Sequence, residues 1–167
     1  MGSTAPSSYY IFDMTIPLFL QQNALTVGTA ESCTGGSIAA TLTAVSGSSA
    51  YVKGGIVAYS NDVKTNVLGV SAEDILRYGA VSEQVVHQMA RGAQRILACD
   101  CAVATSGVAG PTGGTPDKPV GTVWIAAAYG EQIRTQCFHF EGTRSENVQA
   151  STETALRMLL DLLSNSF

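Results

Sequence analysis

The feature that most constrains the fold of this chain is a strand-to-helix turn, Ala30-Glu31-Ser32-Cys33-Thr34-Gly35-Gly36. The apolar residues 25–30 before it are typical of a short buried strand, and residues 37–42 after it predict a tightly packed helix. The unpaired amides of a first helical turn point outward, and the glycines have no side chain that would block a ligand. The turn therefore predicts a cradle that binds an anion or a developing oxyanion, with Ser32 beside it as a candidate nucleophile. The alternative is that Ser32 or Thr34 only caps the helix.

Helices and strands alternate through most of the chain, which implies parallel strands joined by crossover helices. The last two predicted strands flank Gly130-Glu131 closely enough to form an antiparallel hairpin. We predict an α/β fold with three α/β/α layers and a mixed, mostly parallel five-stranded sheet that has one antiparallel strand. Residues 1–12 are expected to be a tail, and residues 13–167 a single domain. The predicted strands span 25–30, 51–59, 101–106, 120–129 and 133–140. The first two predicted helices span 13–23 and 37–42, three more begin after the caps Ser60, Ser71 and Ser82, and the last spans 148–163.

Composition and charge limit the classes of partner. The chain is 46% hydrophobic and only 13% charged, so we expect a homo-oligomer, with a dimer favoured, that buries part of this apolar surface. A net charge of -4 argues against nucleic-acid binding driven by phosphate neutralisation. The sequence lacks a signal peptide or an apolar run of membrane-spanning length, which favours a cytoplasmic protein with no membrane partner. The four cysteines form no C-x-x-C pair and the two histidines lie in unrelated segments, so we expect no metal site and no cofactor.

The segment after Ser82 carries apolar residues at helical spacing, which predicts a helix with one face in the core. His87 and Arg91 fall on its polar side, and we expect both to be solvated. The core-facing positions are Val86, Met89, Ala90, Ala93, Ile96 and Leu97.

Three candidate site elements follow the ends of predicted strands. Ser32 and Tyr59 stand at the ends of two of them, and residues 107–119 form a loop too long for a simple connection. In α/β sheets, ligands gather at the carboxyl ends of the strands. We therefore expect Ser32, Tyr59 and this loop to share one crevice.

A serine nucleophile needs a base, and Lys64 is the candidate because neither histidine lies at a predicted strand end. Lys64 comes early in the helix capped by Ser60, where burial and the positive helix N-terminus would lower its pKa towards that of a usable base. Tyr59 lies near enough to relay a proton or to hold the lysine in register. The alternative is that Lys64 is a solvated surface charge.

Cys33 is the rival nucleophile, because a thiol at a helix N-terminus is activated. Alternation along the strand puts Cys33 and Ser32 on opposite sides, so only one of them can face the crevice. We predict that Ser32 faces it and that Cys33 packs beneath the turn.

Several motifs in order resemble the CinA C-terminal domain family over nearly the whole segment from Thr15 to Leu163. They are the turn at 30–36, Gly47-Ser48-Ser49, Tyr59-Ser60-Asn61 with Lys64, Gly79-Ala80-Val81-Ser82, and Gly107-Val108-Ala109-Gly110-Pro111 with the residues up to Trp124. The resemblance implies an α/β/α amidohydrolase that converts nicotinamide mononucleotide to nicotinic acid mononucleotide and ammonia, in pyridine-nucleotide salvage. It also implies that Ser32 is the nucleophile and that Tyr59 and Lys64 assist.

The resemblance suggests which residues would hold the substrate, a pyridine mononucleotide. Arg144, at the start of the last helix, is the candidate for the 5′-phosphate, because a guanidinium fork matches phosphate oxygens. The remaining candidates for substrate binding are Thr34, Gly35, Gly36, Ser48, Asn61, Gly107, Ala109 and Gly110.

The chain departs from the family pattern near Arg144. Gly142-Thr143-Arg144 lacks the aspartate of the usual G-D-R, Gln149 stands where an arginine is usual, and Ser106 replaces a more usual threonine. These changes are compatible with weaker affinity, with a different substrate, or with an inactive paralogue that binds a nucleotide or docks a partner in competence or damage responses. The intact trio of Ser32, Lys64 and Tyr59 favours activity.

Overall fold

A computed structural model describes residues 8–167, with side chains from Thr15 onward, and its elements follow the predicted order. The strands are β1 (Val27–Glu31), β2 (Val52–Val57), β3 (Cys101–Gly107), β4 (Thr122–Tyr129) and β5 (Gln132–His139). The helices are α1 (Ser8–Gln22), α2 (Ser37–Thr43), α3 (Asn61–Asn66), α4 (Ala72–Tyr78), α5 (Glu83–Leu97) and α6 (Arg144–Ser164), with a short 3-10 helix η1 (Ser48–Ala50).

The strands form one five-stranded sheet in the order β2-β1-β3-β4-β5. β1 pairs in parallel with both β2 and β3, whereas β4 is antiparallel to both β3 and β5. Only β4 therefore runs against the other strands, which confirms the predicted mixed sheet with one reversed strand. The carboxyl ends of β1, β2 and β3 lie at the same edge of the sheet, so the residues that follow them can meet there.

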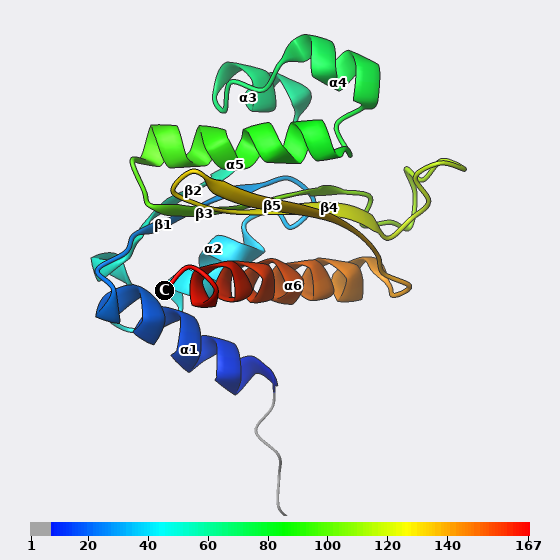
Figure 1. The fold of residues 1–167 in the computed structure, drawn as a ribbon. Helices are drawn as coiled ribbons and strands as arrows, with labels where there is room; N and C mark the ends of the chain where they lie inside the picture. Colours follow the sequence, from blue (N-terminus) through cyan, green and yellow to red (C-terminus); the bar gives the residue numbers. More distant parts are fainter. Residues whose placement is uncertain (1–7) are drawn as a thin grey trace, which may run out of the picture.

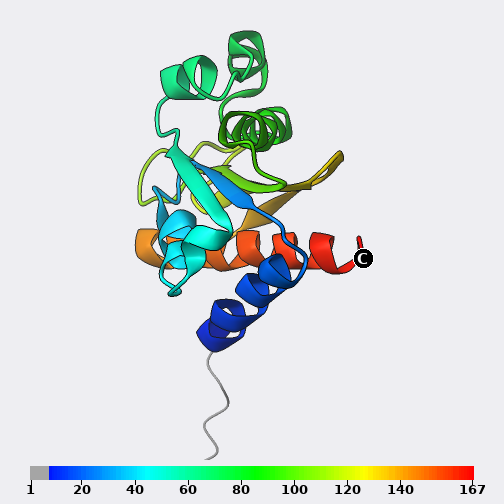
Figure 2. The same ribbon diagram turned by 90° about the vertical axis from the view of Figure 1, so that its left-hand side faces the viewer.

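Helices cover both faces of the sheet (Figure 1, Figure 2). α5 packs on one face with α3 and α4 outside it, and α2 and α6 pack on the other face with α1 beyond them. Strand alternation sorts the side chains between the two cores: Val123 and Ile125 of β4 join the core under α6, whereas Ala126 and Ala128 join the core under α5. The small side chains on that second face let α5 lie close to the sheet.

Serine caps begin three of the helices, as predicted. The hydroxyls of Ser60, Ser71 and Ser82 accept hydrogen bonds from backbone amides three residues later, at 3.3, 3.2 and 3.4 Å. These caps fix where α3, α4 and α5 start, and thereby set which side of each helix faces the sheet.

The core-facing stripe of α5 is confirmed at most of its positions. Val86, Met89, Ala90 and Ala93 are fully buried, but Ile96 is 44% exposed. At 3.6 residues per turn, Ile96 lies at the margin of the stripe, so its prediction as a core residue was wrong.

The first helix begins earlier than predicted. α1 starts at Ser8 rather than at Asp13, so Pro17 lies inside the helix instead of in its first turn. The predicted tail, residues 1–12, is therefore partly helical, and residues 1–7 lie outside the described residues. No helix within residues 8–167 combines the length and the apolar character that crossing a membrane requires.

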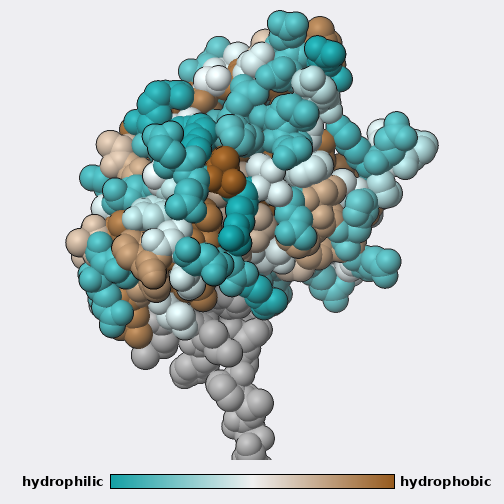
Figure 3. Space-filling view, viewed as in Figure 1, coloured by the Kyte–Doolittle hydropathy of each residue, from teal (hydrophilic) through white to brown (hydrophobic). Residues whose placement is uncertain are grey.

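One face of the molecule is mostly hydrophilic, with hydrophobic side chains scattered among the polar ones (Figure 3). The exposed large apolar residues include Leu18, Val57 and Leu76. The homo-oligomer expected from composition stays a prediction, and light scattering that finds only monomer would contradict it.

Candidate active site

A pocket of about 160 Å³ lies at the carboxyl edge of the sheet. Its walls come from the ends of β1, β2 and β3 and from the start of α6. The crevice that we expected Ser32, Tyr59 and the loop at 107–119 to share is therefore present. The lining residues are Ser32, Cys33, Tyr59, Gly107, Ala109 and Arg144.

Lys64 lies against Ser32 and is almost completely buried. Its side chain is 1% exposed, and its Nζ lies 3.0 Å from Ser32 Oγ and 2.8 Å from the carbonyl oxygen of Ala58. Neither partner carries a negative charge, and burial lowers the pKa of the Lys64 amine. The alternative of a solvated surface lysine is therefore wrong.

A neutral amine in this position can act as the base for Ser32. Neutral Lys64 keeps N–H donors and gains a lone pair. An N–H that donates to the Ala58 carbonyl orients the nitrogen, and the lone pair can then accept the proton of the Ser32 hydroxyl. The Ser60 cap of α3 places Lys64 in this orientation, because it fixes the start of the helix.

A buried carboxylate that the sequence did not predict as a functional residue holds the turn after β1. Glu31 is fully buried, directly precedes Ser32, and accepts two hydrogen bonds from amides in the first turn of α2. It therefore occupies the position that we predicted for a bound anion. The donors to its two oxygens are the hydroxyls of Thr29 and Thr34 and the amides of Ile38 and Ala39.

The predicted ligand cradle does not form at Thr34, Gly35 and Gly36, because none of the three lines the pocket. The Thr34 hydroxyl is directed to Glu31 instead, at 2.7 Å. Two other amides belong to residues that line the pocket: within residues 8–167, those of Cys33 and Ala109 make no hydrogen bond to another residue. These two amides are candidate donors to an oxyanion.

Tyr59 and Arg144 form the rim of the pocket. The Tyr59 side chain is 62% exposed, and its hydroxyl accepts a hydrogen bond from Arg144 Nη2 at 3.0 Å. Arg144 Nη1 donates to the Gly110 carbonyl at 2.8 Å, and further N–H groups of its planar fork remain for a ligand. Tyr59 therefore braces Arg144, and not Lys64 as the sequence suggested.

Asn147 is a second residue that the sequence did not reveal. It is buried in α6, and its amide nitrogen donates to the carbonyls of Ala109 and Gly142 at 3.0 and 3.1 Å. Its oxygen accepts a hydrogen bond from the Gly142 amide at 2.9 Å. Asn147 thus ties the loop after β3 to the turn that carries Arg144.

Gly107 allows the loop after β3 to pass close to β4. A Cβ at this position would lie 2.7 Å from the carbonyl oxygen of Thr122 and 2.8 Å from the Cα of Val123, both of them backbone atoms. A larger residue would therefore move the pocket wall at Ala109.

Cys33 is among the residues that line the pocket, and it also packs against the core under α6, as predicted for a residue beneath the turn. Burial raises the pKa of the Cys33 thiol to about 11, and this thiol is therefore not the activated nucleophile of a helix N-terminus.

Ser48 and Asn61 are not brought to the pocket. Ser48 lies in η1, ahead of β2 and thus at the amino edge of the sheet, where its hydroxyl donates to the Thr43 carbonyl at 3.3 Å. Asn61 is exposed at the start of α3 and does not line the pocket. Gly110 contributes its carbonyl, which holds Arg144, rather than a pocket wall.

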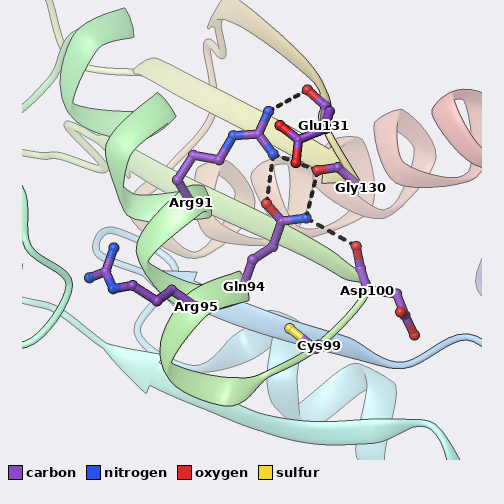
Figure 4. Close-up of a pocket in the computed structure, with 7 residues that line it drawn as sticks. All are labelled: Arg91, Gln94, Arg95, Cys99, Asp100, Gly130 and Glu131. Atoms are coloured by element: carbon purple, nitrogen blue, oxygen red, sulfur yellow. Dashed lines mark hydrogen bonds between the residues drawn. The ribbon is translucent and has the colours of Figure 1, made fainter.

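A larger cavity of about 410 Å³ lies at the opposite edge of the sheet (Figure 4). There the Arg91 guanidinium donates to the carbonyls of Gly130 and Glu131, and the Gln94 amide donates to those of Asp100 and Gly130. Arg91 was expected to be solvated but instead ties α5 to the turn between β4 and β5. The hydrogen bonds of Arg91 and Gln94 to backbone carbonyls therefore hold structure at this edge.

Comparisons of the sequence with known proteins identify similar chains. Residues 13–163 match the family model of the CinA C-terminal domain. A CinA-like protein of Chlorobium limicola is 47% identical over 148 residues, which cover 86% of this chain and 34% of the relative. One of Mycolicibacterium vanbaalenii is 53% identical over 135 residues, which cover 80% of this chain and 32% of the relative. The chain thus spans about a third of the length of these curated relatives.

Solved structures share the fold. A competence/damage inducible protein from Agrobacterium tumefaciens aligns with a TM-score of 0.91 at 40% identity, covering 96% of this chain and 99% of the other. A CinA superfamily protein from Klebsiella pneumoniae aligns with a TM-score of 0.90 at 36% identity, covering 95% of this chain and 99% of the other.

Proposed function

Since the chain belongs to the CinA C-terminal domain family, we propose that it is an amidohydrolase that converts nicotinamide mononucleotide to nicotinic acid mononucleotide and ammonia. One observation carries the proposal: a buried amine of lowered pKa lies 3.0 Å from the hydroxyl of Ser32 in a pocket at the carboxyl edge of the sheet. A serine paired with a neutral amine is a nucleophile suited to attack on an amide carbonyl.

In the first half of the reaction, Ser32 Oγ attacks the carboxamide carbon while Lys64 Nζ takes the hydroxyl proton. Negative charge develops on the carbonyl oxygen, and the amides of Cys33 and Ala109 donate to it. Lys64 then returns the proton to the leaving nitrogen. Ammonia departs, and an ester between the substrate acyl group and Ser32 remains.

In the second half, a water molecule attacks this ester, and Lys64 accepts a proton from the water. The bond to Ser32 Oγ breaks, and the serine regains its proton from Lys64. Nicotinic acid mononucleotide leaves with the free carboxylate. Atoms balance with one water consumed and one ammonia released in each cycle.

The shape of the pocket suggests how the substrate is divided between its interior and its rim. Its volume of about 160 Å³ is below the range of roughly 300–1,000 Å³ usual for drug-sized ligands, which suits the carboxamide ring rather than the whole nucleotide. The ribose and phosphate then lie towards the rim, where the free donors of Arg144 match phosphate oxygens. The exposed Tyr59 ring lies beside that path.

The residues near Arg144 that depart from the family pattern leave the contacts of this rim in place. Thr143 takes the cap position of α6, where its hydroxyl accepts from the Glu146 amide and Glu146 accepts from the Thr143 amide. The cap that an aspartate would supply is therefore kept. Gln149 is exposed and donates to Glu153 at 3.2 Å, away from the pocket-lining residues.

An ammonia-release assay with nicotinamide mononucleotide tests the proposal, with Ser32→Ala and Lys64→Met as matched controls. We expect release by the native chain, none above background from Ser32→Ala, and a rate lower by at least about 10²-fold from Lys64→Met. The alternative is a nucleotide-binding or partner-docking paralogue without activity. Saturable binding of the mononucleotide with no ammonia from the native chain would favour that alternative and reject the amidohydrolase.

A further inference from the structure

The loop after β3 is held at consecutive peptide units where it forms the wall of the pocket. The Val108 amide donates to the Thr122 carbonyl at 2.8 Å, and the Val108 carbonyl accepts from the Gly121 amide at 2.7 Å. One residue further, the Ala109 carbonyl accepts from the Asn147 side chain at 3.0 Å. Ala109 itself is buried and lines the pocket. The backbone on both sides of Ala109 is therefore fixed.

The amide of Ala109 lies between these two held carbonyls, and within residues 8–167 it has no partner of its own. The peptide bond between Val108 and Ala109 is trans, so this N–H points away from the Val108 carbonyl and from Gly121. An unpaired amide on a buried residue costs free energy unless a ligand or a water molecule accepts its hydrogen bond. The Ala109 amide is thus a donor whose direction is set before any ligand arrives.

Asn147 holds Ala109 against the turn that precedes α6. Its side chain is 1% exposed, and its Nδ2 donates to the carbonyls of Ala109 and Gly142 at 3.0 and 3.1 Å. Its Oδ1 accepts from the Gly142 amide at 2.9 Å. The plane of this side-chain amide cannot turn without breaking contacts at both of its ends. Asn147 therefore fixes the loop relative to the start of the helix.

Arg144 and Asn147 hold neighbouring carbonyls of this loop from one helix. The two residues are three positions apart, so they are neighbours on the surface of α6. Arg144 Nη1 donates to the Gly110 carbonyl at 2.8 Å, while the other donors of its fork remain for a phosphate at the rim. Asn147 holds the preceding carbonyl, that of Ala109. The start of α6 thus supports two separate parts of the site, the rim and the Ala109 amide.

We propose that Asn147 is a positioning residue that directs the Ala109 amide at the carboxamide oxygen, on which negative charge develops when Ser32 attacks. The inference rests on the proposed function, because this oxyanion forms only if the chain hydrolyses a carboxamide. Asn147 does not touch the substrate and acts through the loop. Its effect belongs to the transition state, since the oxygen carries the charge there and not in the bound substrate.

The test compares the steady-state kinetics of the native chain and Asn147→Ala, with nicotinamide mononucleotide and with its riboside, which lacks the phosphate. We expect kcat to fall about 10- to 100-fold, less than the roughly 10²- to 10³-fold cost of removing an oxyanion donor outright, because the amide is displaced and not deleted. KM for the mononucleotide should stay close to the native value, because Arg144 is kept. The riboside should lose the same factor in kcat, because it carries the same carboxamide.

Two further variants separate this effect from a loosened helix. Thr152 is also buried in α6, and its hydroxyl donates to the Val148 carbonyl at 2.8 Å within the helix, so Thr152→Val should keep the native kcat and KM. Asn147→Asp keeps the shape of the side chain and an acceptor for the Gly142 amide, but its carboxylate has no proton for the Ala109 carbonyl. It should show the same fall in kcat, and it replaces Asn147→Ala if that variant does not fold. Urea unfolding verifies that each variant is folded in the assay.

A raised KM for the mononucleotide with an unchanged kcat would overturn the proposal, because it would show that the loss of Asn147 only displaces Arg144. A native kcat in the folded Asn147 variants would overturn it as well, and would leave the proposed function standing because the native chain is then active. A native chain that releases no ammonia from either substrate would instead reject the proposed function, and this inference with it.

Discussion

The two edges of the sheet carry two cavities that differ in how their polar groups are satisfied. At the amino edge, Arg91 and Gln94 donate to backbone carbonyls and so hold α5 against the turn between β4 and β5. At the carboxyl edge, the pocket is less than half as large, and Lys64 is buried behind its Ser32 with only a hydroxyl and a carbonyl as partners. A functional site is thus marked by a group held in a state it would not adopt in water, and not by the size of the hollow.

Ser32→Ala should produce the largest effect and tests whether the carboxyl edge alone carries the chemistry. Loss of the attacking hydroxyl should lower kcat for ammonia release by at least about 10⁴-fold, because no acyl-enzyme can form. Cys33→Ala is the matched neighbour and should retain most of the activity. A Cys33→Ala variant that loses turnover while Ser32→Ala keeps it would reverse the assignment.

Lys64→Met should lower kcat by about 10²- to 10⁴-fold, the usual contribution of a general base. The native rate should rise with pH as the amine loses its proton, since only the neutral form accepts a proton from Ser32. Because burial lowers the pKa of Lys64, the rise should be complete below the ordinary lysine value of 10.5. If the rate under saturating substrate does not change with pH below 10.5, Lys64 is not the base.

Arg144→Ala should act on binding at the rim. The loss of charge-assisted hydrogen bonds to the phosphate should raise KM by about 10- to 100-fold, with a smaller change in kcat. Arg144→Lys should recover part of the affinity, because it restores the charge without the planar fork. Steady-state kinetics with the mononucleotide and with its riboside, which lacks the phosphate, provide the check: the riboside should be indifferent to both variants.

Arg91→Ala should have the smallest effect on turnover, and it tests whether the cavity at the amino edge of the sheet is only structural. The variant loses the hydrogen bonds to the turn between β4 and β5, so urea unfolding should show a stability lower by about 1 kcal/mol. Ammonia release by the folded variant should match the native rate. A loss of turnover without a loss of stability would mean that the amino-edge cavity takes part in function.

The sequence predicted those parts of the fold that local chemistry determines. Ser60, Ser71 and Ser82 mark helix starts because a serine oxygen satisfies amides only three residues away. Ser32, Tyr59 and Gly107 were placed together because each follows a strand, and the parallel order of β1, β2 and β3 sends those strand ends to one edge.

The sequence could not predict contacts between distant segments. Asn147 lies on an otherwise ordinary helix, and nothing local shows that it holds the Ala109 carbonyl. The bond between Tyr59 and Arg144 likewise depends on how α6 crosses the sheet. Glu31 left a local signal, an acidic residue at the end of a strand that leads into a helix, but its burial follows from packing that the sequence pattern does not show.

One error came from extending a pattern beyond its range. Motif membership was taken to place Ser48 near the substrate, although η1 lies at the other edge of the sheet. The position of Ser48 follows from the path of the backbone ahead of β2, which the motif alone does not show.

The rim of the pocket joins the third and the last quarters of the chain, through the contact of Arg144 with the Gly110 carbonyl and the hold of Asn147 on Ala109. A chain emerging from the ribosome therefore cannot present a finished pocket until α6 has docked. The moment at which turnover begins during synthesis or refolding would consequently report when α6 docks. A chain truncated ahead of α6 would show no turnover, however well the sheet had formed.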